Sequence, residues 1–168
     1  MKCSFCDKTA VYKSKKSYCE EHFIKYYEGK VKQTIKRYKL ISNKDMVAVA
    51  CSGGKDSTTT LYILSRLYKN VEAIAIDEGI SGYRKRTLNG LKSFCNKHNI
   101  TLHIYSFKDW FGFNLDSIKD KTRLCMACGV FRRSLLNIKA DGFDKIATGH
   151  NIDDEAQSIL MNLIKTNM

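Results

Sequence analysis

The chain has 168 residues, of which 43% are hydrophobic, and this composition excludes a disordered chain. The length is enough for one domain with a proper core and a small appendage. The 29 basic and 17 acidic side chains give a net charge of +12, which favours a polyanionic partner such as nucleic acid.

No apolar run reaches the length of about 18 residues that a membrane-spanning helix needs. The first residues also lack the apolar core of a signal peptide. We therefore expect a cytoplasmic protein that does not contact a membrane. The seven cysteines are an odd number, which in a reducing compartment argues against a disulfide framework and for metal binding.

The first predicted unit, residues 1–27, contains metal-ligand residue types at the spacing C-x2-C-x12-C-x2-H. Cys3, Cys6, Cys19 and His22 would form a compact tetrahedral zinc site with three thiolates and one imidazole. Because this segment has too few apolar residues to fold unaided, we expect the zinc ion to be structural.

Residues 28–44 are predicted as a basic linker, with a helix over residues 28–40 because apolar side chains recur there at helical spacing. In residues 45–168, segments of strand character alternate with helical patterns. We expect strands over residues 46–50, 71–77, 101–107 and 143–149, helices over residues 56–69, 83–99, 126–140 and 152–165, and a loop over residues 109–123. This alternation predicts an α/β domain in which helices cover both faces of a parallel sheet.

A glycine-rich motif, S-G-G-K-D-S, lies between the first predicted strand of this domain and the helix that follows. Paired glycines allow a tight turn whose amides approach an anion, the helix N-terminus adds its positive dipole, and the lysine adds a compact charge. We expect the motif to hold pyrophosphate through Ser52, Gly53, Gly54, Lys55, Asp56 and Ser57. The adjacent glycines distinguish it from a Walker A loop. It resembles instead the loop of the PP-loop ATP pyrophosphatases, which implies that the β and γ phosphates of ATP leave as pyrophosphate while AMP is transferred.

Two further segments are predicted at the same edge of the sheet, where the ligands of open α/β sheets bind. Asp77 ends the second strand of the domain. The segment after the fourth strand contributes Gly149, His150, Asn151, Asp153 and Asp154. The two carboxylates of this segment could bind the Mg²⁺ that accompanies ATP or could cap the next helix, and the sequence leaves both roles open.

A second cysteine pair, Cys125 and Cys128, is predicted near a helix start beside Arg123, Arg132 and Arg133. Positive surroundings lower the pKa of a thiol and favour the thiolate. Half of a structural zinc site, a redox dithiol and the ligands of an iron–sulfur cluster all fit this pattern. The two cysteines in apolar contexts, Cys51 and Cys95, are expected to be buried small hydrophobic residues.

Taken together, the N-terminal finger and the segments ACSGGKDS, CMACGVFRR and TGHNIDDEAQSILMNLI resemble the tRNA 2-thiolation enzymes over nearly the whole chain. This family includes the cytosolic wobble-uridine thiolases of archaea and eukaryotes and, more distantly, the 2-thiocytidine enzymes. The resemblance implies an adenine nucleotide α-hydrolase-like (PP-loop) domain with a small N-terminal zinc finger. It also implies the activity of a tRNA 2-thiouridine synthetase, an ATP-dependent sulfurtransferase.

The resemblance implies that the C2 carbonyl oxygen of uridine attacks the α phosphate of ATP, after which a sulfur nucleophile displaces AMP. Asp77 would approach the adenosine, Asp153 or Asp154 the metal or the activated base, and Arg132 the reacting groups. Cys125 and Cys128 would hold a 4Fe-4S or 3Fe-4S cluster. Sulfur would come from the thiocarboxylate of a ubiquitin-like carrier or from sulfide. The finger and the basic helix would hold the tRNA backbone, and a homodimer is compatible with the family.

Two other functions remain open from the sequence: another adenylating enzyme of the PP-loop type, or a non-catalytic zinc-finger fragment that binds tRNA. Relatives in the resembled family bind their cluster through a third cysteine further along the chain. The last predicted helix has no C-terminal capping signal, and we expect a chain that is shortened at its C-terminus.

Overall fold

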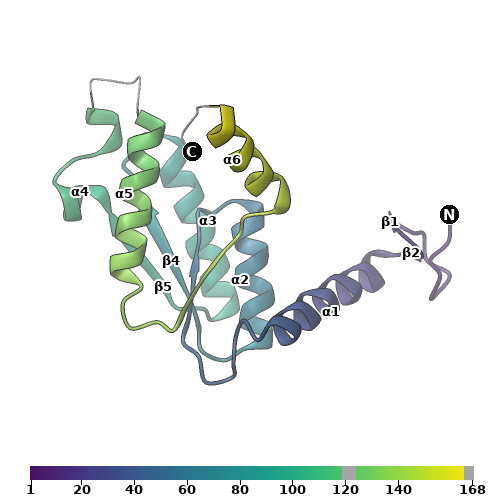
Figure 1. Cartoon of the computed structure of the whole chain (residues 1–168). Coiled ribbons are helices and arrows are strands. Elements are labelled where there is room, and N and C mark those ends of the chain that lie inside the picture. The colour runs from purple at the N-terminus through teal and green to yellow at the C-terminus, as the bar shows by residue number, and fades with distance from the viewer. Residues whose placement is uncertain (119–123, 165–168) are drawn as a thin grey trace. The chain divides into compact units, whose positions relative to one another are not determined.

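The computed structural model describes residues 1–118 and 124–164, with Cys125 described by its backbone only. The chain divides into two compact units, residues 1–42 and residues 43–168 (Figure 1). Within the described residues, every helix is too short or too polar to cross a lipid bilayer.

The first unit consists of an antiparallel pair of two-residue strands, β1 (Tyr12–Lys13) and β2 (Ser17–Tyr18), followed by helix α1 (Glu20–Tyr38). The predicted start of this helix at residue 28 was wrong, because α1 begins inside the predicted finger. Two glutamates occupy its first turn, where negative charge stabilises the N-terminus of a helix. Residue 27 therefore lies within a continuous helix.

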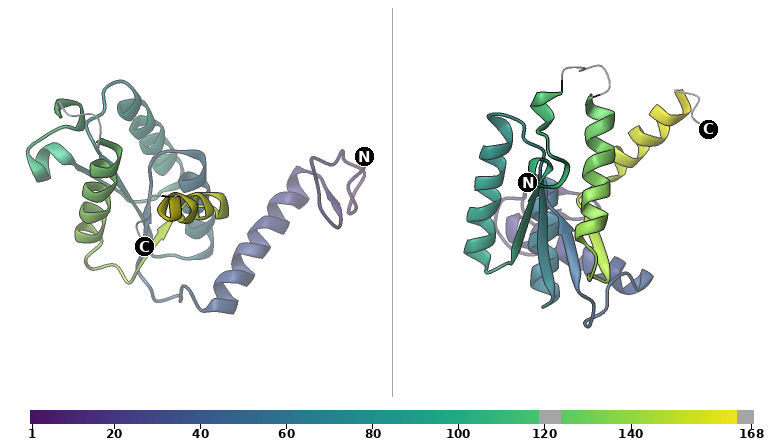
Figure 2. Two further views of the ribbon diagram at one scale, coloured as in Figure 1. Left: turned by 45° about the horizontal axis from the view of Figure 1, so that its top comes forward. Right: turned by 90° about the vertical axis from the view of Figure 1, so that its left-hand side faces the viewer.

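The second unit is built on a four-stranded parallel sheet with the strand order β5-β4-β3-β6. Its strands are β3 (Val47–Ala50), β4 (Val71–Asp77), β5 (Leu102–Ser106) and β6 (Lys145–Thr148). Its longer helices are α2 (Lys55–Leu67), α3 (Tyr83–His98), α5 (Leu124–Lys139) and α6 (Ile152–Ile164). Helices α2 and α3 cover one face of the sheet and α5 covers the other, which confirms the predicted fold class (Figures 1 and 2).

Side chains of the central strand β4 alternate between the two faces, as the pleat of a strand requires. Ile74 and Ile76 pack in a core cluster with Phe107 and with Leu135 of α5. The residues between them, such as Ala75, are also buried, so β4 is apolar on both faces. This pattern is typical of a parallel sheet covered on both sides.

Part of the predicted loop over residues 109–123 is helical. Helix α4 (Phe107–Phe111) and a 3₁₀ turn, η1 (Leu115–Ser117), lie between β5 and residue 118, and residues 119–123 lie outside the described residues. The Ser106 hydroxyl caps α4 by accepting a hydrogen bond from the Asp109 amide at 3.0 Å. Phe107 is fully buried, so core packing fixes this turn as a helix.

Candidate functional site

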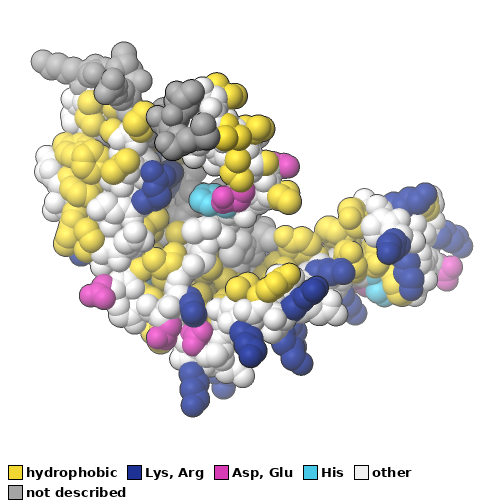
Figure 3. Space-filling model, in the orientation of Figure 1, with side chains coloured by type: hydrophobic (Ala, Val, Ile, Leu, Met, Phe, Trp, Pro, Cys, Tyr) yellow, Lys and Arg dark blue, Asp and Glu magenta, His cyan; other side chains and the backbone are white. Residues whose placement is uncertain are grey.

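A cavity of about 530 Å³ opens at the carboxyl ends of β3 and β6. Strand β4 pairs with one edge of β3, and β6 pairs with the opposite edge of β3. A reversal of strand order of this kind leaves a crevice in which open α/β sheets bind ligands. Side chains of α5 and the start of α6 complete the wall, and Figure 3 shows basic side chains on the α5 side and histidine and acidic side chains where α6 begins.

The S-G-G-K-D-S motif is here called the glycine loop (residues 52–57). Four of its residues line this cavity: Ser52, Gly54, Asp56 and Ser57. Gly53 has a φ of +83°, and a Cβ at this position would lie 2.7 Å from the Thr87 carbonyl oxygen, so only glycine fits. The hydroxyls of Ser52 and Ser57 lie 3.3 Å apart. The loop therefore presents two hydroxyls and the N-terminus of α2 to the cavity.

Lys55 and Asp56 form an ion pair at the start of α2, with Nζ 2.8 and 2.9 Å from the two carboxylate oxygens. Hydrogen bonding and charge from Asp56 raise the pKa of Lys55. The Lys55 side chain is 86% exposed and does not line the cavity, whereas Asp56 does. An exposed ion pair of this kind is weak, so Asp56 holds Lys55 only loosely, and phosphate binding by Lys55 stays a prediction.

Gly149, at the end of β6, lies against the backbone of the glycine loop. A Cβ at this position would lie 2.6 Å from the Ser57 amide nitrogen and 2.7 Å from its Cα atom. Gly149 and His150 both line the cavity, and their binding of a cofactor stays a prediction. Close approach of these two backbone segments therefore requires a residue without a side chain at position 149.

The acidic residues that follow form the cap of α6. The Asn151 side-chain oxygen accepts hydrogen bonds from the amides of Asp153 and Asp154 at 2.9 and 3.1 Å. Asp154 Oδ2 in turn accepts from the Asn151 amide at 2.9 Å, which completes a reciprocal capping box. Asp154 also lines the cavity, whereas Asn151 and Asp153 do not. Capping is thus observed for this segment, and metal binding by Asp153 or Asp154 stays a prediction.

At the end of β4, the residue that lines the cavity is Glu78 and not the predicted Asp77. Asp77 Oδ1 accepts a hydrogen bond from the Gly79 amide at 3.0 Å. Ile74, Ile76 and Glu78 share the cavity side because alternate residues of a strand face the same way. The proposed contact of Asp77 with adenosine stays a prediction.

Sequence reasoning missed a buried pair, Glu78 and Arg84, in the cavity wall. Their side chains are 6% and 5% exposed, and Arg84 Nε lies 2.8 Å from Glu78 Oε2. Arg132, which was predicted as a site residue, and Arg133 line the cavity from α5. An ion pair between residues on different elements has no local sequence pattern that could have revealed it.

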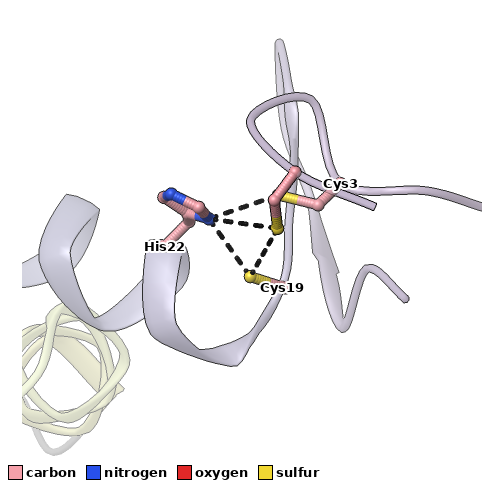
Figure 4. Close-up of side chains that lie close together, drawn as sticks. Cys3, Cys19 and His22 are labelled. Atoms are coloured by element: carbon pink, nitrogen blue, oxygen red, sulfur yellow. Dashed lines mark hydrogen bonds between the residues drawn. The ribbon is translucent and has the colours of Figure 1, made fainter. Parts of the chain in front are cut away.

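The finger cysteines and histidine gather at a second site, within the first unit. Figure 4 shows the side chains of Cys3, Cys19 and His22 pointing toward one another, and the ligand atoms of all four predicted residues lie within 4.8 Å. The His22 Nδ1 atom lies 3.6, 3.6 and 3.2 Å from the sulfurs of Cys3, Cys6 and Cys19. Ligand atoms around a tetrahedral zinc ion would be roughly 3.5–3.8 Å apart, so the cluster fits Zn²⁺.

Two thiols of this cluster differ in pKa. Burial raises the pKa of the Cys3 thiol, but hydrogen bonds from the backbone of Cys19 and Phe5 lower it more, to about 6, so the thiolate of Cys3 is favoured at neutral pH. A hydrogen bond from the Lys8 backbone lowers the pKa of the Cys6 thiol, but burial and the neighbouring thiols of Cys19 and Cys3 raise it more.

Residues 24–168 match the family model of the PP-loop domain. The chain belongs to the PP-loop domain family. The predicted family resemblance is thereby confirmed.

Curated relatives of this PP-loop domain protein are named for tRNA thiolation. The chain is 42% identical over 172 residues to the tRNA-5-methyluridine(54) 2-sulfurtransferase of Pyrococcus horikoshii, covering 99% of this chain and 56% of the relative. It is 38% identical over 164 residues to the cytoplasmic tRNA 2-thiolation protein 1 of Chlamydomonas reinhardtii, covering 91% of this chain and 46% of the relative. The chain thus spans about half the length of these relatives.

A solved structure, the U34-tRNA thiolase NcsA from Methanococcus maripaludis with its [4Fe-4S] cluster, matches with a TM-score of 0.84 and 41% identity. The match covers 99% of this chain and 58% of NcsA. The match to NcsA therefore includes both units of the chain.

The second cysteine pair of the PP-loop domain lies in the first two turns of α5. Cys128 is buried and belongs to the core cluster, while the side chain of Cys125 lies outside the described residues, as does Arg123. Cys128 precedes Arg132 by one helical turn. The thiol pair and the cavity are therefore connected through a single helix.

The other two cysteines, Cys51 and Cys95, are 3% and 1% exposed, which confirms the prediction that they are buried. Burial raises the pKa of the Cys51 thiol to about 12, and it raises that of Cys95 as well. Neither is therefore a thiolate at neutral pH, although Cys51 lines the cavity.

Proposed function

We propose that this chain carries the ATP-binding and uridine-activating part of a tRNA 2-thiouridine synthetase. The observation that carries the proposal is a single cavity shared by the glycine loop and by Arg132 and Arg133. Both arginines lie on α5, the helix that also contains Cys125 and Cys128. A loop suited to phosphates and a helix with two cysteines thus meet at one site, and relatives of this chain are named as tRNA thiolases and sulfurtransferases.

In this proposal the hydroxyls and amides of the glycine loop hold the β and γ phosphates of ATP. Lys55 exchanges its contact with Asp56 for one with these phosphates. Arg132 stabilises the negative charge that develops when the C2 oxygen of uridine bonds to the α phosphate and pyrophosphate departs. A sulfur nucleophile then bonds to the C2 carbon, and the bond between this carbon and the AMP oxygen breaks.

Three metal groups belong to the same proposal. Zn²⁺ would be held by the four finger residues and would stabilise the first unit. Mg²⁺ would be bound through Asp153 or Asp154, of which Asp154 lines the cavity. Cys125 and Cys128 are suited to an iron–sulfur cluster because they lie in the N-terminal part of a helix near two arginines. Such a cluster, when bound, would supply the sulfur that a thiocarboxylate carrier or sulfide delivers.

The tRNA would contact the basic surface of α1. Six exposed basic side chains follow this helix and its C-cap: Lys25, Lys30, Lys32, Lys36, Arg37 and Lys39 (Figure 3). Contacts of lysine and arginine with phosphates position a nucleic acid without reading its sequence. We place the protein in the cytoplasm as part of this proposal, in accord with the name of its algal relative.

Lys55→Ala is expected to weaken the binding of ATP at least about tenfold, because a charge-assisted hydrogen bond to phosphate is lost. Isothermal titration of the full chain with a non-hydrolysable ATP analogue measures this loss. Lys69→Ala is the matched control, since it removes the same charge beyond the opposite end of α2. Equal affinities of the Lys55 variant and the control would contradict the phosphate role of the loop.

The proposed activity is tested by mass spectrometry of tRNA nucleosides from cells in which the gene for this chain is deleted. We expect 2-thiouridine to disappear from the tRNA and to return when the gene is restored. Sequencing then assigns the lost sulfur to U34 or to position 54, the two sites for which the relatives are named. An unchanged nucleoside profile would contradict the proposal.

A further inference from the structure

We propose that Glu78, itself held by Arg84, is a positioning residue that orients Arg132 at the nucleotide cavity. The inference rests on the proposed function, because the loop and Arg132 are the groups proposed to contact ATP. Neither Glu78 nor Arg84 was predicted from the sequence as a site residue.

Burial distinguishes this pair from the other charged groups in the part of the chain that the structure describes. Among residues 1–118 and 124–164, Glu78 and Arg84 are the only charged side chains that are buried. Burying a charge is costly even when it is paired, so a buried ion pair is weak evidence for a role in stability alone. Both residues also line the cavity, which indicates a role at the site.

Arg84, which lies on α3, connects the ends of two strands. Its Nη1 atom donates a hydrogen bond to the Ser52 carbonyl oxygen at 2.5 Å, and its Nη2 atom donates to the carbonyl oxygen of Ile76. Ser52 is the first residue of the glycine loop and Ile76 is near the end of β4. One guanidinium thus fixes the distance between the loop and the neighbouring strand.

Glu78 connects the guanidinium of Arg84 to helix α5, which contains Cys125 and Cys128. Its Oε2 atom contacts Arg84, while its Oε1 atom lies 3.5 Å from Nη1 of Arg132 on α5. The backbone of Glu78 is itself held, because its carbonyl oxygen accepts a hydrogen bond from the Leu115 amide at 2.8 Å. A single carboxylate therefore joins the glycine loop, through Arg84, to Arg132.

The consequence of this arrangement is that the positively charged guanidinium of Arg132 is held in one orientation. The Arg132 side chain is 47% exposed, and an arginine in contact with water samples many rotamers unless a partner fixes it. One carboxylate shared by two guanidiniums leaves this three-residue cluster with a net positive charge, although Asp56 and Asp154 also line the cavity. Glu78 thus orients Arg132.

A double-mutant cycle separates positioning from a structural role. The full chain, Glu78→Gln, Arg132→Gln and the double variant are titrated with a non-hydrolysable ATP analogue. We expect Glu78→Gln to weaken binding about tenfold when Arg132 is present, and by less than about twofold when Arg132 is already replaced. Equal weakening in both backgrounds would overturn the inference, because Glu78 would then act independently of Arg132.

Glu72→Gln is the matched control. Glu72 lies on β4, the strand that Glu78 follows, and its Oε2 atom is 2.6 Å from Nε2 of His103, but it does not line the cavity. We expect its nucleotide affinity to equal that of the unsubstituted chain. If Glu78→Gln does not fold, as judged by circular dichroism, Glu78→Asp takes its place in the cycle, since it keeps the charge and withdraws the carboxylate from Arg132. Additive effects of Glu78→Asp and Arg132→Gln would overturn the inference in the same way.

The experiment distinguishes this inference from the function on which it rests. An unsubstituted chain that does not bind the nucleotide would contradict the proposed function and the positioning role together. A chain that binds the nucleotide but shows additive effects in the cycle would contradict the positioning role only.

Discussion

Replacing Gly149 with alanine is expected to abolish nucleotide binding and to lower the free energy of unfolding by about 2 kcal/mol or more. The added Cβ would lie 2.6 Å from the Ser57 amide nitrogen and 2.8 Å from the Asp56 carbonyl carbon. These are backbone atoms at the start of α2, so no side chain can rotate to make room. The glycine loop would have to move away from the end of β6, and the cavity between them would lose its shape.

Gly90→Ala is the matched control for this substitution. Gly90 is exposed within α3, and a Cβ there would meet no atom within 4 Å. Because alanine has the higher helix propensity, we expect a gain of about 0.5–1 kcal/mol and unchanged nucleotide affinity. Chemical denaturation and isothermal titration measure the two quantities. If Gly149→Ala matched the unsubstituted chain in unfolding free energy and in nucleotide affinity, the close packing of Gly149 on the glycine loop would not be needed for either.

Removal of zinc is expected to unfold residues 1–42 while leaving the second unit folded. Besides Ile35 and Tyr18, the buried hydrophobic residues of the first unit are the ligands Cys3 and Cys19, so the unit has little core beyond its metal cluster. The apparent binding free energy of a structural zinc ion, about 10–16 kcal/mol, exceeds what so small a core supplies. Proteolysis in the presence of a chelator should therefore cut this unit first.

Metal analysis of the purified chain provides the control for this prediction. We expect one zinc ion per chain, lost in Cys19→Ser and retained in Cys95→Ala, which replaces a buried cysteine outside the cluster. A first unit that resists proteolysis without zinc would contradict the structural role. Two zinc ions per chain would instead assign zinc to Cys125 and Cys128.

Several features of the site could be predicted because they depend on residues close together in the sequence. The spacing of Cys3, Cys6, Cys19 and His22 is sufficient to place four ligand atoms in one cluster, since a short loop and the first turn of a helix connect them. The glycine loop is local in the same sense. The prediction of its position between a strand and a helix needed only the change from strand to helix periodicity.

Other features could not be predicted because they depend on contacts between distant segments. Helix α4 replaces the end of the strand predicted over residues 101–107 and the start of the loop predicted over residues 109–123, and the burial of Phe107 in the core determines this. Asp77 was predicted at the site, whereas Glu78 was not. Because β4 is apolar on both faces, the alternation of its side chains does not reveal which face borders the cavity.

By itself, the sequence determined the order of the strands and longer helices of the second unit, the spacing of the four finger residues and the position of the glycine loop, because each of these follows from backbone preferences and side-chain chemistry within a few neighbouring residues. Only the tertiary structure decided that Gly149 lies against Ser57, and that Glu78 joins Arg84 to Arg132. The physical reason is that steric contact and charge pairing depend on distance in space, and the parallel sheet brings residues 52, 78, 132 and 149 together at one edge.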